Sequence, residues 1–334
     1  MVSLSKKRLS EIFSGLSGRR IAVVGDLMVD RYFWGTVTRI SPEAPVPVVE
    51  VEDESTRLGG AANVANNIAT LGGIPVMLGV VGNDSGGQLL RQLVEERGYP
   101  TDGIVSDASR PTTIKTRVIA QDQHVVRVDH EAKHDIASDV QRRLVEVLER
   151  ELPRLDGIIL EDYNKGVMTR DLIAGVITAA RKDRRIITVD PKFNNFFAYK
   201  GVTVFKPNRK ESEEALGVRI RSLEEVERAG RDIVARIEAE SVLLTLGEQG
   251  MMLIERSGEV AHVPTMARKV ADVSGAGDTV IATLTMAMAA GASLREAAAL
   301  ANHAGGIVCG EVGIVPIDPA VLFDRIAESS AGGL

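Results

Sequence analysis

Short apolar segments recur along this chain and alternate with segments that have the periodicity of helices. The apolar segments are rich in Val, Ile and Leu and lack the alternating polar positions of a half-exposed strand. Strands of this kind must be covered on both faces, so the pattern predicts an α/β fold with a doubly wound, mostly parallel sheet flanked by helices. We expect strands at 20–25, 75–81, 157–160, 186–189, 202–205 and 242–246, and helices that include 60–71 and 86–97.

Polar or glycine residues directly follow several of these predicted strands. In an open parallel sheet, ligands bind beyond the carboxyl ends of the strands. The positions to examine for function are therefore Asp26, Glu161, Asp162, Asp190, Asn208 and Gly247.

Two stretches interrupt the alternation of strands and helices. Residues 46–51 and 113–120, the latter followed by 124–128, have the pattern of strands with no helix between partners. They predict a small antiparallel sheet with one face left to cover. We interpret the chain as a single domain over residues 1–334, with a β-sheet lid formed by two insertions at about 31–52 and 110–130; ordinary edge strands are the alternative.

Composition excludes several classes of protein. Of the 334 residues, 44% are hydrophobic and 26% charged, as in globular proteins, and the net charge of −6 argues against binding to nucleic acid or to an anionic membrane. The single cysteine, Cys309, cannot form an internal disulfide, and one cysteine with five histidines argues against a zinc site. No apolar run reaches the roughly 18 residues of a membrane span, and residues 9–16 have the spacing of an amphipathic helix instead of a signal peptide. We therefore expect a cytoplasmic protein.

The segment from Asp272 to Thr279, DVSGAGDT, immediately precedes an apolar helical run. Gly275 and Gly277 permit a tight turn and leave amide N–H groups unobstructed at the start of the helix, where these groups and the helix dipole attract phosphate. Asp278 would then lie beside the anion and accept a proton from an attacking hydroxyl group. The alternative is a glycine-rich turn in which the acidic residue only stabilises the helix.

A pair of glycines opens the predicted helix at 60–71. Gly59 and Gly60 permit close approach of the backbone to a ligand, and Asn63 offers a donor and an acceptor to hydroxyl groups. Asp26 and Asp30, which follow the first strand, are candidates to accept hydrogen bonds from sugar hydroxyls. Helix–strand packing and helix capping are the alternatives. The chain has neither a G-x-G-x-x-G motif nor a P-loop, which argues against a dehydrogenase.

Two further segments have the residues of a nucleotide site. Asn208 and Glu211 lie where a strand meets a helix, and a carboxylate there could hold a hydrated Mg²⁺ on a substrate phosphate; a capping box is the alternative. The segment TLGEQG contains Thr245, Gly247 and Gly250, and either shapes a nucleotide pocket or forms a hairpin.

In their joint order, these motifs resemble those of the ribokinase-like (PfkB-type) carbohydrate kinases, over about residues 20–318. The resemblance implies a doubly wound α/β domain with a β-sheet lid, and transfer of the γ-phosphoryl group of ATP, with Mg²⁺, to a sugar hydroxyl. It implies that Asp278 is the general base and that Gly275, Ala276 and Gly277 form the anion hole. It assigns to the sugar Asp26, Gly59, Gly60 and Asn63, and to ATP and Mg²⁺ Asn208, Glu211 (through water), Thr245, Gly247, Gly250 and Asn302.

Four segments are similar to the D-glycero-β-D-manno-heptose 7-phosphate kinase branch of that family: RISPEAPVPVV (39–49), TTIKTRVIA (112–120), DYNKG (162–166) and VDPK (189–192). That similarity implies phosphorylation of the anomeric O1 to the 1,7-bisphosphate, on the way to ADP-heptose for lipopolysaccharide. After VDPK the branch usually has Gly and acidic residues, whereas this chain has FNNFF (193–197). A substrate that carries phosphate needs cations. The candidate substrate-binding residues are Lys115, Arg117, Lys165 and Lys192, together with Asp162.

Other functions remain compatible with the sequence. They are a kinase acting on ribose, fructose 1-phosphate or a nucleoside, and a non-catalytic protein that senses a sugar or a nucleotide. Some relatives carry a C-terminal nucleotidyltransferase domain, and because this chain ends at Leu334 we expect that step in a separate protein. The uncovered face of the lid favours a homodimer. A monovalent cation is a further cofactor that the resemblance leaves open.

Overall fold

The computed structural model describes residues 4–121, 123–266 and 271–331, and its main sheet has nine strands in the order β13-β12-β11-β10-β9-β8-β1-β4-β5. Each pair from β11 to β5 is parallel, and only the pairs β11–β12 and β12–β13 are antiparallel. The strands are β1 (Arg20–Gly25), β4 (Ile74–Gly82), β5 (Ile104–Asp107), β8 (Gly157–Glu161), β9 (Ile186–Asp190), β10 (Val204–Phe205), β11 (Ser241–Thr245), β12 (Met251–Glu255) and β13 (Val260–Val263).

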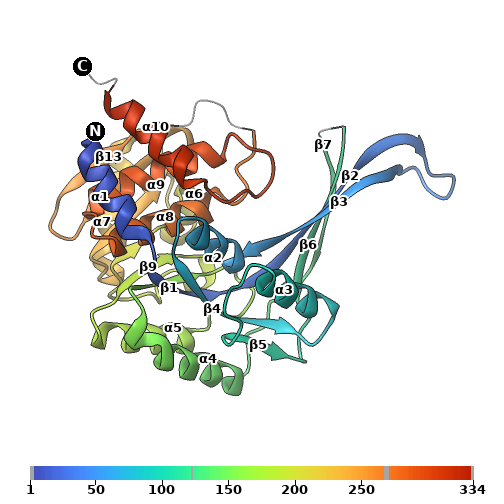
Figure 1. The fold of residues 1–334 in the computed structure, drawn as a ribbon, viewed down its shortest axis with the longest axis horizontal. Helices are drawn as coiled ribbons and strands as arrows, with labels where there is room; N and C mark the ends of the chain where they lie inside the picture. The colour runs from blue at the N-terminus through green and yellow to red at the C-terminus, as the bar shows by residue number, and fades with distance from the viewer. Residues whose placement is uncertain (1–3, 122, 267–270, 332–334) are drawn as a thin grey trace.

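Helices cover both faces of this sheet, so two hydrophobic cores form, one on each side (Figure 1). The first core lies under α1 (Lys6–Leu16), α2 (Ala61–Thr70), α3 (Ser85–Glu95), α8 (Ala276–Ala289), α9 (Leu294–Val308) and α10 (Pro319–Ala331). The second lies under α4 (Ser138–Glu151), α5 (Arg170–Lys182) and α7 (Leu223–Ile237), and the short α6 (Arg209–Leu216) follows β10. None of the helices in the described ranges combines the length and the apolar character needed to cross a bilayer.

A second sheet, here called the small sheet, projects from the body of the molecule (Figure 1). It consists of β3 (Pro47–Gly60), β2 (Leu27–Ile40), β6 (Thr113–Ala120) and β7 (Gln123–His130), in that order. Several apolar side chains remain exposed on it or at its tip, namely Ile40, Val46, Val51, Val126 and Val128. The expected insertions at 31–52 and 110–130 fall within this sheet and the loops that lead to it.

Most predicted strands and helices are confirmed within one or two residues, but four expectations differ from the structure. The strand predicted at 202–205 is reduced to β10, and the 14-residue β2 was not predicted. The small sheet is not wholly antiparallel, because β2 and β6 run parallel. Gly60 ends β3, pairing with Leu27 of β2, before α2 begins at Ala61. Pairing within the β2–β3 hairpin explains the length of β2 and the extension of the strand predicted at 46–51 as far as Gly60, whereas the direction of β6 depends on where the chain returns to the small sheet.

Candidate active site

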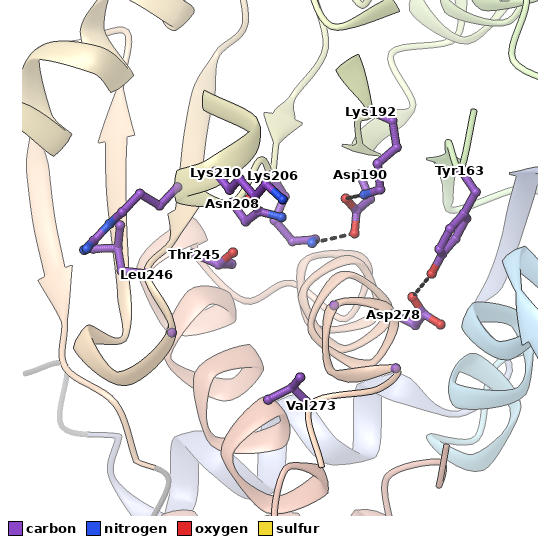
Figure 2. A pocket seen from close by; sticks show the side chains of 14 residues that line it. Tyr163, Asp190, Lys192, Lys206, Asn208, Lys210, Thr245, Leu246, Val273 and Asp278 are labelled. Atoms are coloured by element: carbon purple, nitrogen blue, oxygen red, sulfur yellow. Dashed lines mark hydrogen bonds and ion pairs between the residues drawn. The ribbon is translucent and has the colours of Figure 1, made fainter. Parts of the chain in front are cut away.

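Two adjoining cavities lie beyond the carboxyl ends of β9, β10 and β11. The first, of about 510 Å³, is polar and receives three lysine side chains (Figure 2). The second, of about 500 Å³, is more apolar and reaches between η3 (Gly247–Gln249), α8 and α9. Residues that line the first cavity include Tyr163, Asp190, Lys192, Lys206, Lys210, Gly275 and Asp278. Residues that line the second include Gly250, Met251, Ala276, Val280, Asn302 and Gly305. Four residues line both cavities: Thr245, Gly247, Val273 and Gly277.

The glycine turn before α8 separates the two cavities. Gly275 is the N-cap of α8 with φ of +76°, a left-handed conformation that glycine adopts without strain. A Cβ atom on Gly275 would also lie 3.1 Å from Nδ2 of Asn63. The first turn of α8 borders both cavities, as a phosphate-binding helix terminus requires, but the Ala276 N–H already donates to the Val273 carbonyl oxygen at 3.3 Å, so the anion hole at Gly275, Ala276 and Gly277 stays a prediction. Asp278 lies in this first turn and is only 3% exposed.

Both carboxylate oxygens of Asp278 accept hydrogen bonds. The Tyr163 hydroxyl donates to Oδ1 at 2.6 Å (Figure 2), and Nδ2 of Asn63 donates to Oδ2 at 2.7 Å. Burial raises the pKa of Asp278 to about 6, although both hydrogen bonds act to lower it. The carboxylate is charged above about pH 6, as a general base working near neutral pH needs to be.

A row of alternating charges forms one side of the polar cavity. Lys206 Nζ donates to Asp190 Oδ2 at 2.6 Å, and Lys192 Nζ lies 3.3 Å from Asp190 Oδ1 and 2.7 Å from Glu211 Oε1. Although burial opposes them, these two lysines hold the pKa of Asp190 below its ordinary value. Beside them, burial and the nearby charges of Asp190 and Asp278 raise the pKa of Glu161 well above its ordinary value. Lys192 and Lys206 thus lie on the same cavity as Asp278 but already have carboxylate partners, which a bound polyanion would have to replace.

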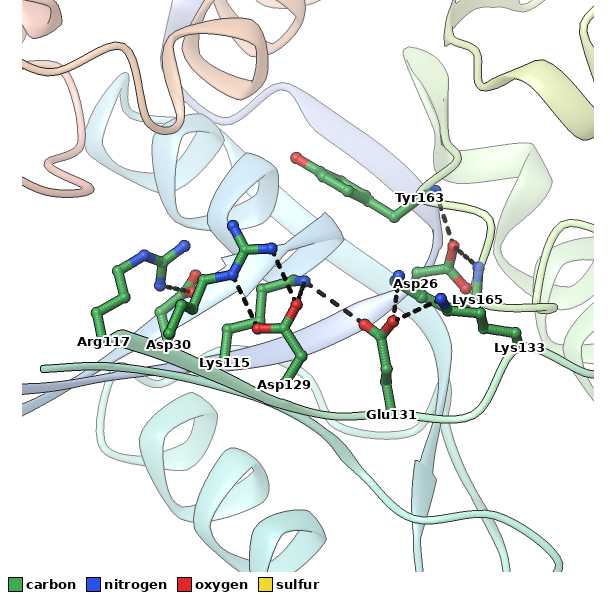
Figure 3. Close-up of polar contacts among 10 residues, drawn as sticks. Asp26, Asp30, Lys115, Arg117, Asp129, Glu131, Lys133, Tyr163 and Lys165 are labelled. Carbon is green, nitrogen blue, oxygen red and sulfur yellow. Dashed lines mark hydrogen bonds and ion pairs between the residues drawn. The ribbon is translucent and has the colours of Figure 1, made fainter. Parts of the chain in front are cut away.

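The two aspartates expected to hold the sugar already have protein partners. Asp26 accepts hydrogen bonds from the backbone N–H groups of Tyr163 (2.8 Å), Lys165 (3.1 Å) and residue 167 (3.2 Å). Asp30, inside β2, forms a buried ion pair with Arg117 of β6 (Figure 3). In this structure, therefore, Asp26 fixes the turn after β8 and Asp30 joins two strands; their contact with a sugar stays a prediction.

Gly59 and Gly60 leave the space that Asp30 and Asp26 occupy. A Cβ atom on Gly59 would lie 2.0 Å from Oδ2 of Asp30, and one on Gly60, whose φ is +56°, would lie 2.5 Å from the backbone oxygen of Asp26. Close packing, the alternative considered for these glycines, is thus present. Asn63, in the first turn of α2, is the residue of this motif whose side chain contacts Asp278.

The expected phosphate-binding cations are also paired with carboxylates. Lys165 Nζ lies 2.7 Å from Glu131, and Lys115 Nζ lies 3.5 Å from the same carboxylate and 3.2 Å from Asp129 (Figure 3). Asp162, the further candidate, accepts hydrogen bonds from the Asn164 amide and the Tyr199 hydroxyl. An incoming phosphate would have to exchange with these carboxylates, so the roles of Lys115, Arg117, Lys165 and Lys192 stay predictions.

The expected nucleotide residues line one or both cavities, except Glu211, which lines neither. Asn208 and Glu211 form the capping box of α6 that the sequence offered as an alternative. One oxygen of Glu211 accepts the Asn208 N–H and the other pairs with Lys192, and no group of three His, Cys, Asp or Glu in the described ranges is arranged to hold a metal. Both Glu211 oxygens thus have protein partners, and the expected contact of Glu211 with Mg²⁺ through water stays a prediction. Asn302, in the apolar cavity, donates to the Pro264 carbonyl at 2.7 Å.

Sequence reasoning missed two side chains that the structure brings to this site. Lys206 had no assigned role, although it directly follows a strand. Tyr163 belongs to the DYNKG segment, but nothing in its sequence context indicates contact with a residue 115 positions away. The position of Lys206 directly after a strand could have identified it as a site residue, whereas no sequence signal could have identified the contact of Tyr163 with Asp278.

Comparisons with known proteins agree with this geometry. Residues 19–320 match the model of the pfkB family carbohydrate kinases. The chain is 44% identical over 323 residues to the bifunctional protein HldE of Geobacter sulfurreducens, a match that covers 97% of this chain and 66% of that protein. It is 43% identical over 295 residues to the bifunctional protein HldE of Helicobacter pylori, a match that covers 88% of this chain and 64% of that protein. It thus spans about two thirds of the length of these relatives.

Solved structures show the same fold at lower identity. Phosphofructokinase-2 from Escherichia coli in complex with potassium superposes with a TM-score of 0.77 at 22% identity, covering 94% of this chain and 99% of that one. Arabidopsis thaliana ribokinase complexed with ribose and ATP gives a TM-score of 0.72 at 20% identity, covering 93% and 99%. The fold is ribokinase-like, and together with the family match over most of its length this shows that the chain belongs to the pfkB family of carbohydrate kinases.

Proposed function

We propose that this carbohydrate kinase transfers the γ-phosphoryl group of ATP to a sugar hydroxyl, with Asp278 as the general base. The observation that carries the proposal is the position of Asp278, in the first turn of α8, on the polar cavity and next to the glycine turn. The apolar cavity suits an adenine base, and the lysines of the polar cavity suit its phosphates. Mg²⁺ would enter with ATP and neutralise phosphate charge.

The chemistry follows from these positions. The sugar oxygen forms a bond to the γ-phosphorus, the bond from that phosphorus to the β–γ bridging oxygen breaks, and ADP leaves with the bond's electron pair. The hydroxyl proton passes to a carboxylate oxygen of Asp278. The amide groups of the first turn of α8, around Gly277, stabilise the charge on the transferring group. Positioning and electrostatics lower the barrier, so no covalent enzyme intermediate is needed.

We propose D-glycero-β-D-manno-heptose 7-phosphate as the substrate and its anomeric O1 as the acceptor. The support is the similarity to relatives named HldE, together with the four segments shared with heptose 7-phosphate kinases. The product would be the 1,7-bisphosphate, a precursor of ADP-heptose for lipopolysaccharide. Nucleotidyl transfer to that precursor would need a catalytic unit outside residues 1–334, because the family match over residues 19–320 is to a kinase.

The decisive experiment is a coupled ADP-release assay with ATP and a panel of sugars and sugar phosphates. We expect turnover with heptose 7-phosphate. Turnover only with ribose, fructose 1-phosphate or a nucleoside would show that heptose 7-phosphate is not the substrate. The absence of turnover with every sugar would favour a sensing protein.

A variant tests the base. Asp278→Asn should still bind ATP and sugar but lose at least about 100-fold in kcat. Asp232→Asn, which changes an exposed carboxylate on α7, is the matched control and should retain full turnover. Near-normal turnover of Asp278→Asn would refute the assignment of the base.

We also propose that the small sheet acts as a lid and pairs two copies of the chain. The support is its row of exposed apolar side chains, which a second copy would cover. Light scattering should give the mass of a dimer, and Val126→Lys should shift it to a monomer. Location in the cytoplasm and a requirement for a monovalent cation remain predictions from the sequence.

A further inference from the structure

Tyr163 connects three parts of the proposed site, although the sequence motifs assign no role to it. Its hydroxyl donates to Asp278 at 2.6 Å, its backbone N–H donates to Asp26 at 2.8 Å, and Lys192 Nζ lies 5.4 Å from the centre of its ring. Figure 2 shows the ring on the cavity wall with its hydroxyl pointing at the Asp278 carboxylate. The side chain thus reaches the base from the turn after β8.

The turn that carries Tyr163 is held rigidly. Asp26 accepts three of its backbone N–H groups, and Lys165 of the same turn pairs with Glu131 at the end of the small sheet (Figure 3). These contacts fix the backbone of the turn and so limit how far the Tyr163 side chain can move from Asp278.

We propose that Tyr163 is a positioning residue for the reaction: it orients the Asp278 carboxylate and keeps it charged, so that the base can accept the hydroxyl proton near neutral pH. This inference rests on the proposed function. A carboxylate that accepts a hydrogen bond from a fixed donor is stabilised in its charged form. With Tyr163 on Oδ1 and Asn63 on Oδ2, the carboxylate also cannot rotate, and each oxygen retains a lone pair for the substrate.

Other charged groups face Asp278, and they determine how easily its carboxylate ionises once the Tyr163 hydroxyl is removed. Asp190 at the end of β9 and Glu161 at the end of β8 oppose its ionisation, and Lys206 after β10 favours it. Burial and Asp278 raise the pKa of the Tyr163 hydroxyl well above its ordinary value, so Tyr163 stays protonated and remains a donor at every pH of interest. Removal of its hydroxyl therefore leaves a buried carboxylate with one donor and two acidic neighbours.

The test is the pH profile of kcat/KM for Tyr163→Phe with the sugar that the wild type uses. We expect the acid limb, near pH 6 in the wild type, to move up by about one pH unit. The variant should then be about fivefold slower than the wild type at pH 6 and nearly equal to it at pH 9. Tyr99→Phe is the matched control, because it removes a 3.0 Å hydrogen bond to Asn66 away from the site, and its profile should not move.

A readout without activity separates this inference from the proposed function. In protein labelled with ¹³C at the aspartate carboxyl carbons, the Asp278 resonance, assigned by its loss in Asp278→Asn, should titrate about one pH unit higher in Tyr163→Phe. An unmoved resonance, an unmoved acid limb, or an equal loss of activity at every pH would each overturn the inference. A shifted resonance in a protein that phosphorylates no sugar would overturn the proposed function alone.

Discussion

The ion pair between Asp30 and Arg117 offers a sharp test of how the small sheet is joined together. The Asp30 side chain is 2% exposed and that of Arg117 is 11% exposed, so water can replace neither partner. Arg117→Met removes the charge but keeps an aliphatic stem to pack on the Tyr32 ring, whose centre lies 5.2 Å from the guanidinium carbon. The variant therefore isolates the loss of the countercharge to Asp30.

The expected loss in the free energy of unfolding comes from keeping the Asp30 carboxylate buried without its countercharge. Breaking a buried pair by removal of one partner lowers the free energy of unfolding by about 3–5 kcal/mol. Burial already raises the pKa of Asp30 against the opposing effect of Arg117, and without Arg117 the pKa rises further. The folded variant then binds a proton that the unfolded chain releases, so its stability falls as the pH rises from the unfolded pKa of Asp30 to the folded one. The wild type loses stability in the same way up to its own folded pKa, so the stability gap grows only between the folded pKa of Asp30 in the wild type and the higher one in the variant, by up to about 1.4 kcal/mol per pH unit.

Urea denaturation at pH 5.5 and pH 8 measures this gap. We expect a loss near 3 kcal/mol at pH 8 and a clearly smaller one at pH 5.5. Arg127→Met, which breaks an ion pair on β7 whose arginine side chain is 56% exposed, is the matched control and should cost about 0–1 kcal/mol at both pH values. A loss below about 1 kcal/mol at pH 8, or an equal loss at both pH values, would refute the reasoning.

Two further substitutions test local features of the site. Asn208→Ala removes the acceptor of the Glu211 N–H at the start of α6 and should lower the free energy of unfolding by about 1 kcal/mol, whereas Asn208→Asp should keep most of it; equal urea midpoints for the two variants would contradict the capping role. Gly60→Ala brings a Cβ atom to 2.5 Å from the Asp26 carbonyl oxygen at a φ of +56°, so it should lower the melting temperature more than Gly98→Ala, which has a φ of +70° but open space around it. Equal losses would mean that packing against Asp26 is not what requires glycine.

The fold class could be predicted because its signals are local. A strand that is apolar on both sides must be covered by helices on both sides, and the run from Ile21 to Val24 shows this without reference to any partner. The same holds for the glycine turn at Gly275, where conformational freedom and the start of an apolar helix lie within a few residues. The family resemblance built on such motifs was confirmed by the comparisons.

The pairing of charges could not be predicted, because it depends on which segments meet. Lys192 was expected to bind a phosphate and Glu211 to serve Mg²⁺, and the structure places them 2.7 Å apart. Arg117 and Asp30 were expected to contact the substrate, and they contact each other across β2 and β6. A charged residue is equally compatible with a ligand or with a protein partner until its neighbours are known.

Sequence by itself determined the layers of this protein, the turn that opens α8 and the carboxylate within it, since each follows from side chains adjacent in the chain. Only the tertiary structure decided that β2 pairs in parallel with β6 and that Tyr163 and Asn63 donate to Asp278. The physical reason is distance along the chain. A hydrogen bond or a strand register between residues far apart in sequence forms only when the packing of the whole sheet brings them together, and burial then determines the charge that each side chain carries.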